Sequence, residues 1–386
     1  MKALYIIPAL FLCAATALAQ PEDPPKLTVG GYVKDLQTLF VFNGIPLPGE
    51  TFIFDQNQIH NRINVQWQFI PSMLLKAEFR NRVFWGDLST RDVIDGLDLS
   101  EDYFDLSIGG SNNRGLGYHA MIDRLYLEFV QGKWEVRLGR QRVNWGISTV
   151  WNPNDVFNAF SFTDFDYEER PGSDALRVRY YTGYASSLEV AAKMADSIEA
   201  AVIAGMGHFN LKGYDFQVLG GLVQNELAIG GGWAGNIKGA GFKGEFTWFQ
   251  PLEEGDSSSF AGTLGLDYMT GKSLYLSTGF LFNSNGVTKA SIANLFDFEL
   301  SAKNLYPYKY SVFLQGAYPI TPLLNGGLAV IYSPSSVHAL FLNPTVSYSI
   351  AQNWDIDLVG QVAMEMDGKT YRSPIQGFFM RVKMSY

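Results

Sequence analysis

The sequence predicts an all-β fold, a transmembrane antiparallel β-barrel of about 16–18 strands. Apolar and polar residues alternate along segment after segment, which is the period of a strand with two different faces. The chain contains 47% hydrophobic residues, 15% aromatic residues and 39 glycines. Beyond its first twenty residues it has no uninterrupted apolar run of about 18 residues, the length that a membrane-spanning helix needs.

The first 19 residues are predicted to be a cleaved secretory signal peptide, which leaves residues 20–386 as the barrel. Lys2 precedes an apolar run that ends in Ala17-Leu18-Ala19, the small-x-small pattern of a cleavage site before Gln20. Cys13 is the only cysteine of the chain. The mature protein would therefore have no disulfide, no thiolate nucleophile and no cysteine metal ligand.

The alternation is clear in residues 58–69, where Ile59 and Trp67 lie on one face of the expected strand and Arg62 lies on the other. Residues 75–85 and 354–366 show the same pattern. A soluble sandwich would bury the apolar face, whereas a membrane barrel would turn it toward lipid. The alternation alone leaves this direction open.

The lengths of the connections favour the membrane barrel. Short turns are expected near residues 70–72, 131–133, 183–186, 210–213, 270–272, 321–322 and 351–353. Longer segments lie between them at 43–55, 87–116, 144–172, 253–259, 284–305 and 367–373. Short turns at one end and long loops at the other are typical of transmembrane barrels. We count about eighteen strands, and about sixteen is almost as good, because glycine-rich runs within 186–240 blur the strand boundaries.

The last thirteen residues form an alternating strand that ends on an aromatic residue. Phe378, Met380 and Val382 share one face, whereas Arg381 and Lys383 share the other, and Tyr386 is the final residue. A closing strand with a terminal aromatic residue resembles the targeting signal of bacterial outer-membrane β-barrels. That resemblance implies insertion into the outer membrane.

Arginine recurs on the polar faces of strands in the first half of the chain. If these faces line a water-filled lumen, the arginines form a basic, pore-lining wall made of Arg62, Arg80, Arg82, Arg124, Arg177 and Arg179. The alternation slips near Gly139, which predicts a β-bulge that re-aims Arg140 and Arg142.

The connection at 144–172 is too apolar for a freely solvated loop, because it carries six aromatic side chains from Trp151 to Tyr167. It resembles the third loop of general porins, which folds into the lumen and sets acidic side chains against arginines. The resemblance implies a constriction built from Asp155, Asp164, Asp166, Glu168 and Glu169. The alternative is that the loop packs over the rim and that its charges are simply hydrated.

A short motif begins within the strand before this connection. Arg-Gln-x-x-x-Trp-Gly followed by Asn-Pro-x-Asp occurs here as Arg140, Gln141, Trp145, Gly146, Asn152, Pro153 and Asp155. It resembles a motif of large, mostly uncharacterised porin-like proteins of the Gram-negative outer membrane. The likeness rests on this short stretch by motif and on the whole chain by layout, and it implies a channel without identifying the solute.

Enzymatic chemistry has little support in the sequence. The four histidines are His60, His119, His208 and His338, and none lies in a His-x-Ser arrangement like that of outer-membrane phospholipases. No metal-binding or nucleotide-binding motif is present, so no cofactor and no metal are expected. The net charge of −9 argues against nucleic-acid binding, which needs a basic surface.

The sequence therefore predicts an outer-membrane porin-like channel that lets small hydrophilic solutes diffuse, with no catalytic residues. Its expected partners are outer-membrane lipids, lipopolysaccharide and the solutes themselves. A homo-oligomer is possible, and the sequence leaves trimer and monomer open. The alternatives are an occluded barrel with an adhesive or structural role and, with less support, an outer-membrane phospholipase-like enzyme.

Overall fold

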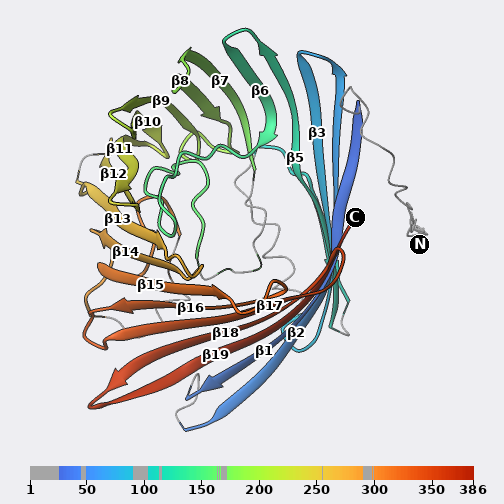
Figure 1. Cartoon of the computed structure of the whole chain (residues 1–386), viewed down its shortest axis with the longest axis vertical. Coiled ribbons are helices and arrows are strands. Elements are labelled where there is room, and N and C mark those ends of the chain that lie inside the picture. The colour runs from blue at the N-terminus through green and yellow to red at the C-terminus, as the bar shows by residue number, and fades with distance from the viewer. Residues whose placement is uncertain are drawn as a thin grey trace.

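The computed structural model describes residues 26–44, 49–89, 103–112, 115–162, 164, 166, 172–253, 255–289, 298 and 300–386. The strands of these segments pair antiparallel with their neighbours into one closed sheet (Figure 1). The expected signal peptide at residues 1–19, with Cys13, lies outside the described residues. No helix in the described segments is long and apolar enough to cross a membrane.

Nineteen strands are present in the described segments. They are β1 (Leu27–Asn43), β2 (Thr51–Ile70), β3 (Met73–Trp85), β4 (Ser107–Ser111), β5 (Leu116–Gln131), β6 (Trp134–Gln141), β7 (Ser173–Gly183), β8 (Ser186–Lys193), β9 (Val202–Leu211), β10 (Tyr214–Val223), β11 (Glu226–Ile237), β12 (Ala240–Pro251), β13 (Ser259–Met269), β14 (Tyr275–Asn283), β15 (Tyr310–Pro319), β16 (Leu324–Ser333), β17 (Ala339–Ala351), β18 (Trp354–Asp367) and β19 (Thr370–Ser385).

Eighteen of these strands form the ring. β5 pairs with β3 along its whole length, whereas its other edge pairs first with the short β4 and then with β6. β4 therefore continues the sheet beyond the end of β6, beside the same edge of β5, and is not counted as a further strand of the ring. β1 pairs with both β2 and β19 and closes the barrel. The predicted all-β barrel of 16–18 strands is confirmed.

The connections alternate in length as the sequence predicts. Eight turns of two to five residues lie at one end of the barrel, the end at which β1 begins and β19 ends. The longer connections lie at the other end. The expectation of a long segment at 367–373 is wrong, because β18 and β19 are joined there by a two-residue turn with Gly368 at φ +64°. Residues 224–225 form a second short turn at this end.

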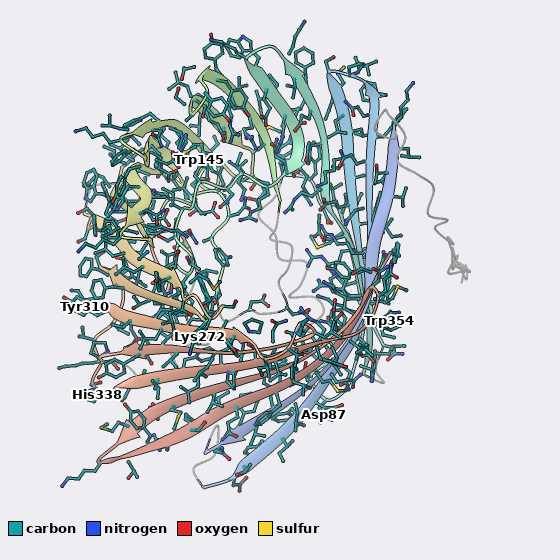
Figure 2. The ribbon with its side chains drawn as sticks, viewed as in Figure 1. Asp87, Trp145, Lys272, Tyr310, His338 and Trp354 are labelled. Carbon is teal, nitrogen blue, oxygen red and sulfur yellow. The ribbon has the colours of Figure 1, made fainter. Side chains whose placement is uncertain are left out.

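The apolar faces point outward and the polar faces point inward. Leu138 and Ile59 are 58% and 46% exposed, whereas Arg62 and Lys34 are 0% and 1% exposed. Figure 2 shows the same division, with Tyr310 projecting away from the ring and Trp145 inside it. A soluble sandwich would bury the apolar side chains instead. The barrel thus has the inside-out polarity of a protein surrounded by lipid.

The ring closes tightly between β1, β2 and β19. The amide nitrogen of Gly31 donates to the carbonyl oxygen of Tyr386 at 2.9 Å, and the amide of Tyr386 donates back at 3.0 Å. The Tyr386 hydroxyl donates to the carbonyl oxygen of Arg62 at 3.0 Å. A Cβ atom on Gly31 would lie 2.0 Å from that same oxygen, so the seam has no room for a side chain there.

We expect Gly31→Ala to reduce the yield of closed barrel by several-fold, because the added methyl group collides with backbone on β2. The measurement is the fraction of refolded protein that migrates faster on a gel before heating than after it. Gly220→Ala is the matched control, since a Cβ at Gly220 has only the carbonyl oxygen of Ala228 nearby, at 3.6 Å. Equal yields for the two variants would contradict this account of the seam.

Candidate functional site: the charged lining of the barrel interior

A β-bulge places an extra acidic residue on the inner face of β5. The register of β3 and β5 shifts between Glu78 and Phe79, so that Asp123 is inserted between residues paired on either side. Consecutive side chains normally alternate across a strand, yet Asp123 and Arg124 are both buried. The prediction of a β-bulge at Gly139 is wrong. The register of β6 continues through that glycine, which instead distorts the strand with a φ of +117°.

Asp123 lies between two arginines from neighbouring strands. Arg62 of β2 bridges Asp123 and Glu78, and Arg80 of β3 binds Asp123 through Nε and Nη2. Arg124 donates from Nη1 to the carbonyl oxygen of Asp123 at 2.9 Å. We call Arg62, Glu78, Arg80 and Asp123 the first ion-pair cluster. All four side chains are buried, so each charge depends on its partners for compensation.

Arg82 lies beside this cluster, nearer the long-loop end of β3. Its Nη2 lies 2.8 Å from Nδ1 of His119, and its guanidinium lies 5.3 Å from the centre of the Phe84 ring. His119 is buried, and so is His60, which packs edge-on against Tyr32. Both histidines therefore belong to the packed inner face.

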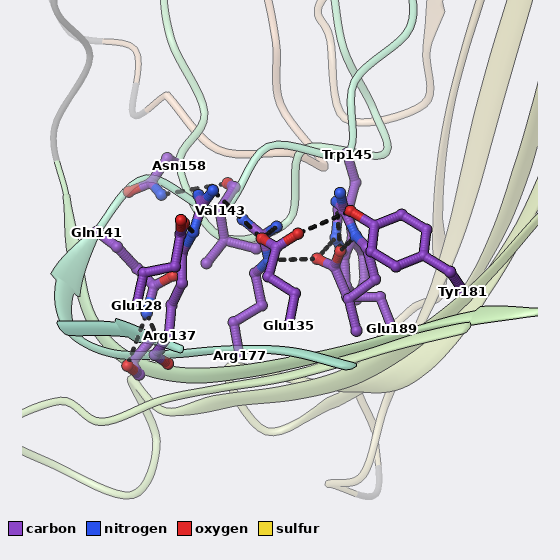
Figure 3. A network of polar contacts seen from close by, with 12 residues as sticks. Glu128, Glu135, Arg137, Gln141, Val143, Trp145, Asn158, Arg177, Tyr181 and Glu189 are labelled. Atoms are coloured by element: carbon purple, nitrogen blue, oxygen red, sulfur yellow. Dashed lines mark hydrogen bonds and ion pairs between the residues drawn. The ribbon is translucent and has the colours of Figure 1, made fainter. Parts of the chain in front are cut away.

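A second ion-pair cluster lies on β6, β7 and β8 (Figure 3). Arg177 binds Glu135 through Nη2 at 2.7 Å, and Arg179 binds Glu189 through Nε at 2.6 Å. Glu189 also accepts a hydrogen bond from the indole nitrogen of Trp145 at 2.7 Å. This last bond ties the beginning of the long connection after β6 to the barrel wall.

The connection between β6 and β7 then runs along the inside of the barrel (Figure 1). Trp145 and Phe157 pack edge to face and join a buried cluster with Ala191, Ala204 and Ala228 of the wall. Farther along, Trp151 packs against Phe313 of β15 in a second buried cluster. The apolar side chains of this connection thus pack against the barrel wall, as the composition of the segment requires.

Small residues on the wall make room for this connection. A Cβ at Gly230 would lie 2.9 Å from Oδ1 of Asn154 and 2.6 Å from Oγ1 of Thr247. Thr247 in turn donates to the carbonyl oxygen of Pro153 at 2.9 Å. The glycine-rich region that blurs the strand pattern in the sequence is therefore the part of the wall on which the connection packs. Large inward side chains there would collide with the connection.

The far part of the connection contacts the opposite side of the barrel. Asp166 accepts a hydrogen bond from Nζ of Lys34 on β1 at 2.7 Å and one from Nη1 of Arg381 on β19 at 3.3 Å. Gln58 of β2 donates to its other carboxylate oxygen at 3.2 Å. The connection therefore reaches from the wall of β11 and β12 to the wall of β19, β1 and β2.

The side chain of Asp164 is accessible to water, but its position inside the barrel reduces its hydration. Burial within the barrel raises the pKa of its carboxyl group to about 6, and the neighbouring Asp166 charge raises it further in the same direction. Lys34 opposes the shift by favouring the charged form. Asp164 thus changes its charge in the range between pH 5 and pH 7.

Asp155, another of the predicted acidic residues, does not lie at this place. Asp155 is fully buried, and its neighbour Asn154 donates to the carbonyl oxygen of Gly231 at 3.0 Å, against the wall of β11 and β12. Glu168 and Glu169 lie outside the described residues.

Several charged groups of the interior were missed in the sequence. Lys34, Arg381 and Asp357 line the inner face near Asp166, and the four carboxylates that pair with the arginines are Glu78, Asp123, Glu135 and Glu189. The alternation places most of these residues on the polar face of their strand, but their pairing depends on the register between strands. For Asp123 the alternation was no guide, because the bulge changes its face.

No protein-family model matches the chain, and no curated protein matches it in sequence. Solved structures do match in fold. The structure of OccK9 from Pseudomonas aeruginosa has a TM-score of 0.60 at 10% identity, over 93% of this chain and 98% of that chain. OccAB4 and OccAB1 from Acinetobacter baumannii each have a TM-score of 0.57 at 10% identity, over 94% and 93% of this chain and 100% and 96% of theirs. The chain shares the β-barrel fold of these three structures.

We expect Asp123→Asn to lower the free energy of unfolding by about 3 kcal/mol, because it leaves two buried arginines with less compensation. The measurement is equilibrium unfolding in urea, in detergent micelles. Lys243→Gln is the control, since Lys243 of β12 and its partner Asp267 of β13 are both partly exposed, and such pairs contribute at most about 1 kcal/mol. Similar losses for both variants would show that the first ion-pair cluster is not specially dependent on Asp123.

Proposed function

We propose that the protein is a porin-like channel of the Gram-negative outer membrane that lets small hydrophilic solutes diffuse. The observation that carries the proposal is the closed eighteen-strand ring with an exposed apolar exterior and a charged interior. Barrels of this strand number are wide enough to enclose an aqueous channel. In this proposal outer-membrane lipids and lipopolysaccharide surround the exterior.

We infer that the connection between β6 and β7 narrows the channel. Asp166 pairs with Lys34 and Arg381 of the wall, and Asp164 lies two residues before it, which supports a transverse field in the narrowest part. Such a field favours dipolar and charged solutes over apolar ones.

The predicted arginine wall takes two roles in this proposal. Arg82 and Arg179 are only partly buried and are assigned to the lining that solutes meet. Arg62, Arg80, Arg124 and Arg177 are buried and are assigned to the support of that lining. Asp155 is likewise buried and is assigned to the part of the connection that packs on the wall.

The Arg-Gln-x-x-x-Trp-Gly motif, which resembles one of a porin-like family, lies at the start of this connection. Arg140 binds Asp174 at the start of β7, through Nε at 2.9 Å and Nη2 at 2.8 Å. The Gln141 side chain donates to the carbonyl oxygen of Ala175 at 2.9 Å. Gly146 has no room for a side chain, since a Cβ there would lie 2.5 Å from Oδ1 of Asn152. We infer that the motif positions the connection, which supports membership of that family.

We expect the refolded protein to form stable ion channels in planar bilayers. The charges of the narrow part, on the connection and on the wall, should set the ion preference of these channels. Asp166→Asn should shift the reversal potential in a salt gradient toward anions, and Lys34→Gln should shift it toward cations, because each removes one charge of the narrow part. Glu253→Gln, an exposed residue in the connection after β12, is the control and should leave the reversal potential unchanged.

The same recordings separate the competing functions. An occluded barrel with an adhesive or structural role, or a phospholipase-like enzyme, requires no ion flow. Absence of conductance from protein shown to be folded by its heat-dependent gel mobility would therefore contradict the channel. Conductance with unaltered ion preference in both charge variants would contradict the placement of the narrow part.

We expect the cation preference of the channel to fall as the pH is lowered from 7.5 to 5, with a midpoint near pH 6. The pKa of Asp164 is raised to about 6, so the group is negative above that pH and neutral below it. Asp164→Asn should have the low cation preference at every pH. The measurement is the reversal potential as a function of pH, and a variant that keeps the step of the wild type would exclude Asp164 as its source.

A further inference from the structure

Polar side chains lie on the outward face of three adjacent strands. Asp35 and Gln37 of β1 share the outward direction of the exposed Val33 and Leu39. On β2 and β3 the exposed Ile59, Phe79 and Val83 mark the outward face. By the alternation of each strand, the outward residues here include four polar residues that are not buried, which we call the polar stripe: Asp35, Gln37, Asn61 and Asn81.

The rest of the barrel presents a different surface at the middle of its strands. There the outward side chains are large, apolar and exposed, as at Ile203, Val218, Ile229, Leu264, Leu314 and Leu358. The polar stripe is therefore a local interruption of the apolar exterior.

The polar stripe lies within the apolar band and not at its edge. Asp35 is paired in register with Val382 of β19 on one side and Ile59 of β2 on the other, both apolar. Asn61 and Asn81 lie directly opposite each other. On β2 the outward residues continue toward the short-turn end as far as the exposed Trp67. Polar groups at such a depth lose hydration without gaining partners from lipid chains.

The hydrogen bonds within the polar stripe are local. Gln37 donates from Nε2 to Oδ1 of Asp35 at 2.7 Å, and the hydroxyl of Tyr118 donates to Oδ1 of Asn81 at 3.2 Å. Asn61 donates from Nδ2 to the hydroxyl of Tyr386 at 3.2 Å and to the carbonyl oxygen of Tyr32 at 3.3 Å, and its amide oxygen remains an acceptor. A carboxamide has two N–H donors and two acceptor lone pairs, so each can also bind a group presented from outside. A surface of carboxamides is complementary to a copy of itself.

The surface around the polar stripe also has a relief that can match a second copy. Ile59, Phe79 and Val83 project from β2 and β3 between the polar side chains. A hollow of about 720 Å³ begins at Gln37 and Asn57 and extends over β19, β18 and β17, where Gly360 and Pro344 line it together with Leu358 and Phe378.

We propose that the polar stripe is the contact surface for a second copy of this chain. The proposal rests on the proposed function in one respect, that the barrel lies in a membrane. All copies inserted by the same route have the same orientation, so a two-fold axis parallel to the barrel axis sets one polar stripe against the other at equal depth. The same axis sets the projecting side chains of each copy opposite the hollow of its partner. Lipid chains offer neither the hydrogen bonds nor the matching shape.

Single-cysteine cross-linking tests the contact in native outer membranes. In a Cys13→Ala background, Asn61→Cys places a thiol in the polar stripe near the expected axis, and Val218→Cys places one on the exposed outward face of β10 as the control. After mild oxidation we expect at least five-fold more disulfide-linked dimer from Asn61→Cys than from Val218→Cys. Equal amounts, or a product of Asn61→Cys with a protein of different mass, would overturn the proposal.

A second variant tests the chemistry of the contact without a cross-link. Asp35→Leu combined with Gln37→Leu makes the polar stripe more apolar and should convert a dimer seen by native mass spectrometry in detergent into a monomer, with unchanged heat-dependent gel mobility. A dimer that persists at the wild-type level would overturn the proposal. Single-channel conductance separates this result from the proposed function, since a cross-linked barrel without conductance contradicts only the channel, and conductance without cross-linking contradicts only the contact.

Discussion

The closed ring of backbone hydrogen bonds is the constraint on which the rest of this structure depends. An unpaired strand edge beside an apolar exterior would have no water with which to form hydrogen bonds. β1 therefore pairs with β19 as well as with β2. The seam is accordingly tight, and Gly31 lets the backbone of the three strands approach around Tyr386. Once the ring is closed, every strand has one face toward the exterior and one toward the interior, and the alternation of the sequence becomes a division between apolar outside and polar inside.

The interior imposes its own constraint, because the inward charges of adjacent strands lie side by side in largely buried positions. The arginines are therefore paired, with Arg62 and Arg80 sharing Asp123 and with Arg177 and Arg179 bound to Glu135 and Glu189. These pairs do more than line the barrel. Glu189 also binds Trp145, so the second ion-pair cluster holds the root of the connection whose far part carries Asp164 and Asp166. The same ion pairs thus compensate the charges of the wall and hold the connection in position.

The candidate site shows where sequence reasoning succeeds and where it stops. The period of two places Arg62, Arg80 and Arg177 on the polar faces of their strands, and no partner needs to be known for this. The β-bulge at Asp123 was not visible, since one inserted residue changes the face of an acidic side chain without leaving a distinct pattern. The slip in alternation at Gly139 was visible but has a different cause, the unusual backbone conformation of that glycine. The glycine-rich stretch looked like weak strands because its function is to accommodate another segment of the chain.

By itself, the sequence determined the class of fold, the approximate number of strands, the alternation of short and long connections and the composition of each face. These properties are local, because each depends on residues a few positions apart along one strand or turn. Only the tertiary structure decided which face looks outward and which charges meet. Lys34 and Asp166 are separated by 132 residues, and Arg62 and Asp123 by 61. Such pairs are brought together by the closure of the ring and by the register between strands, and neither is a property of any single segment.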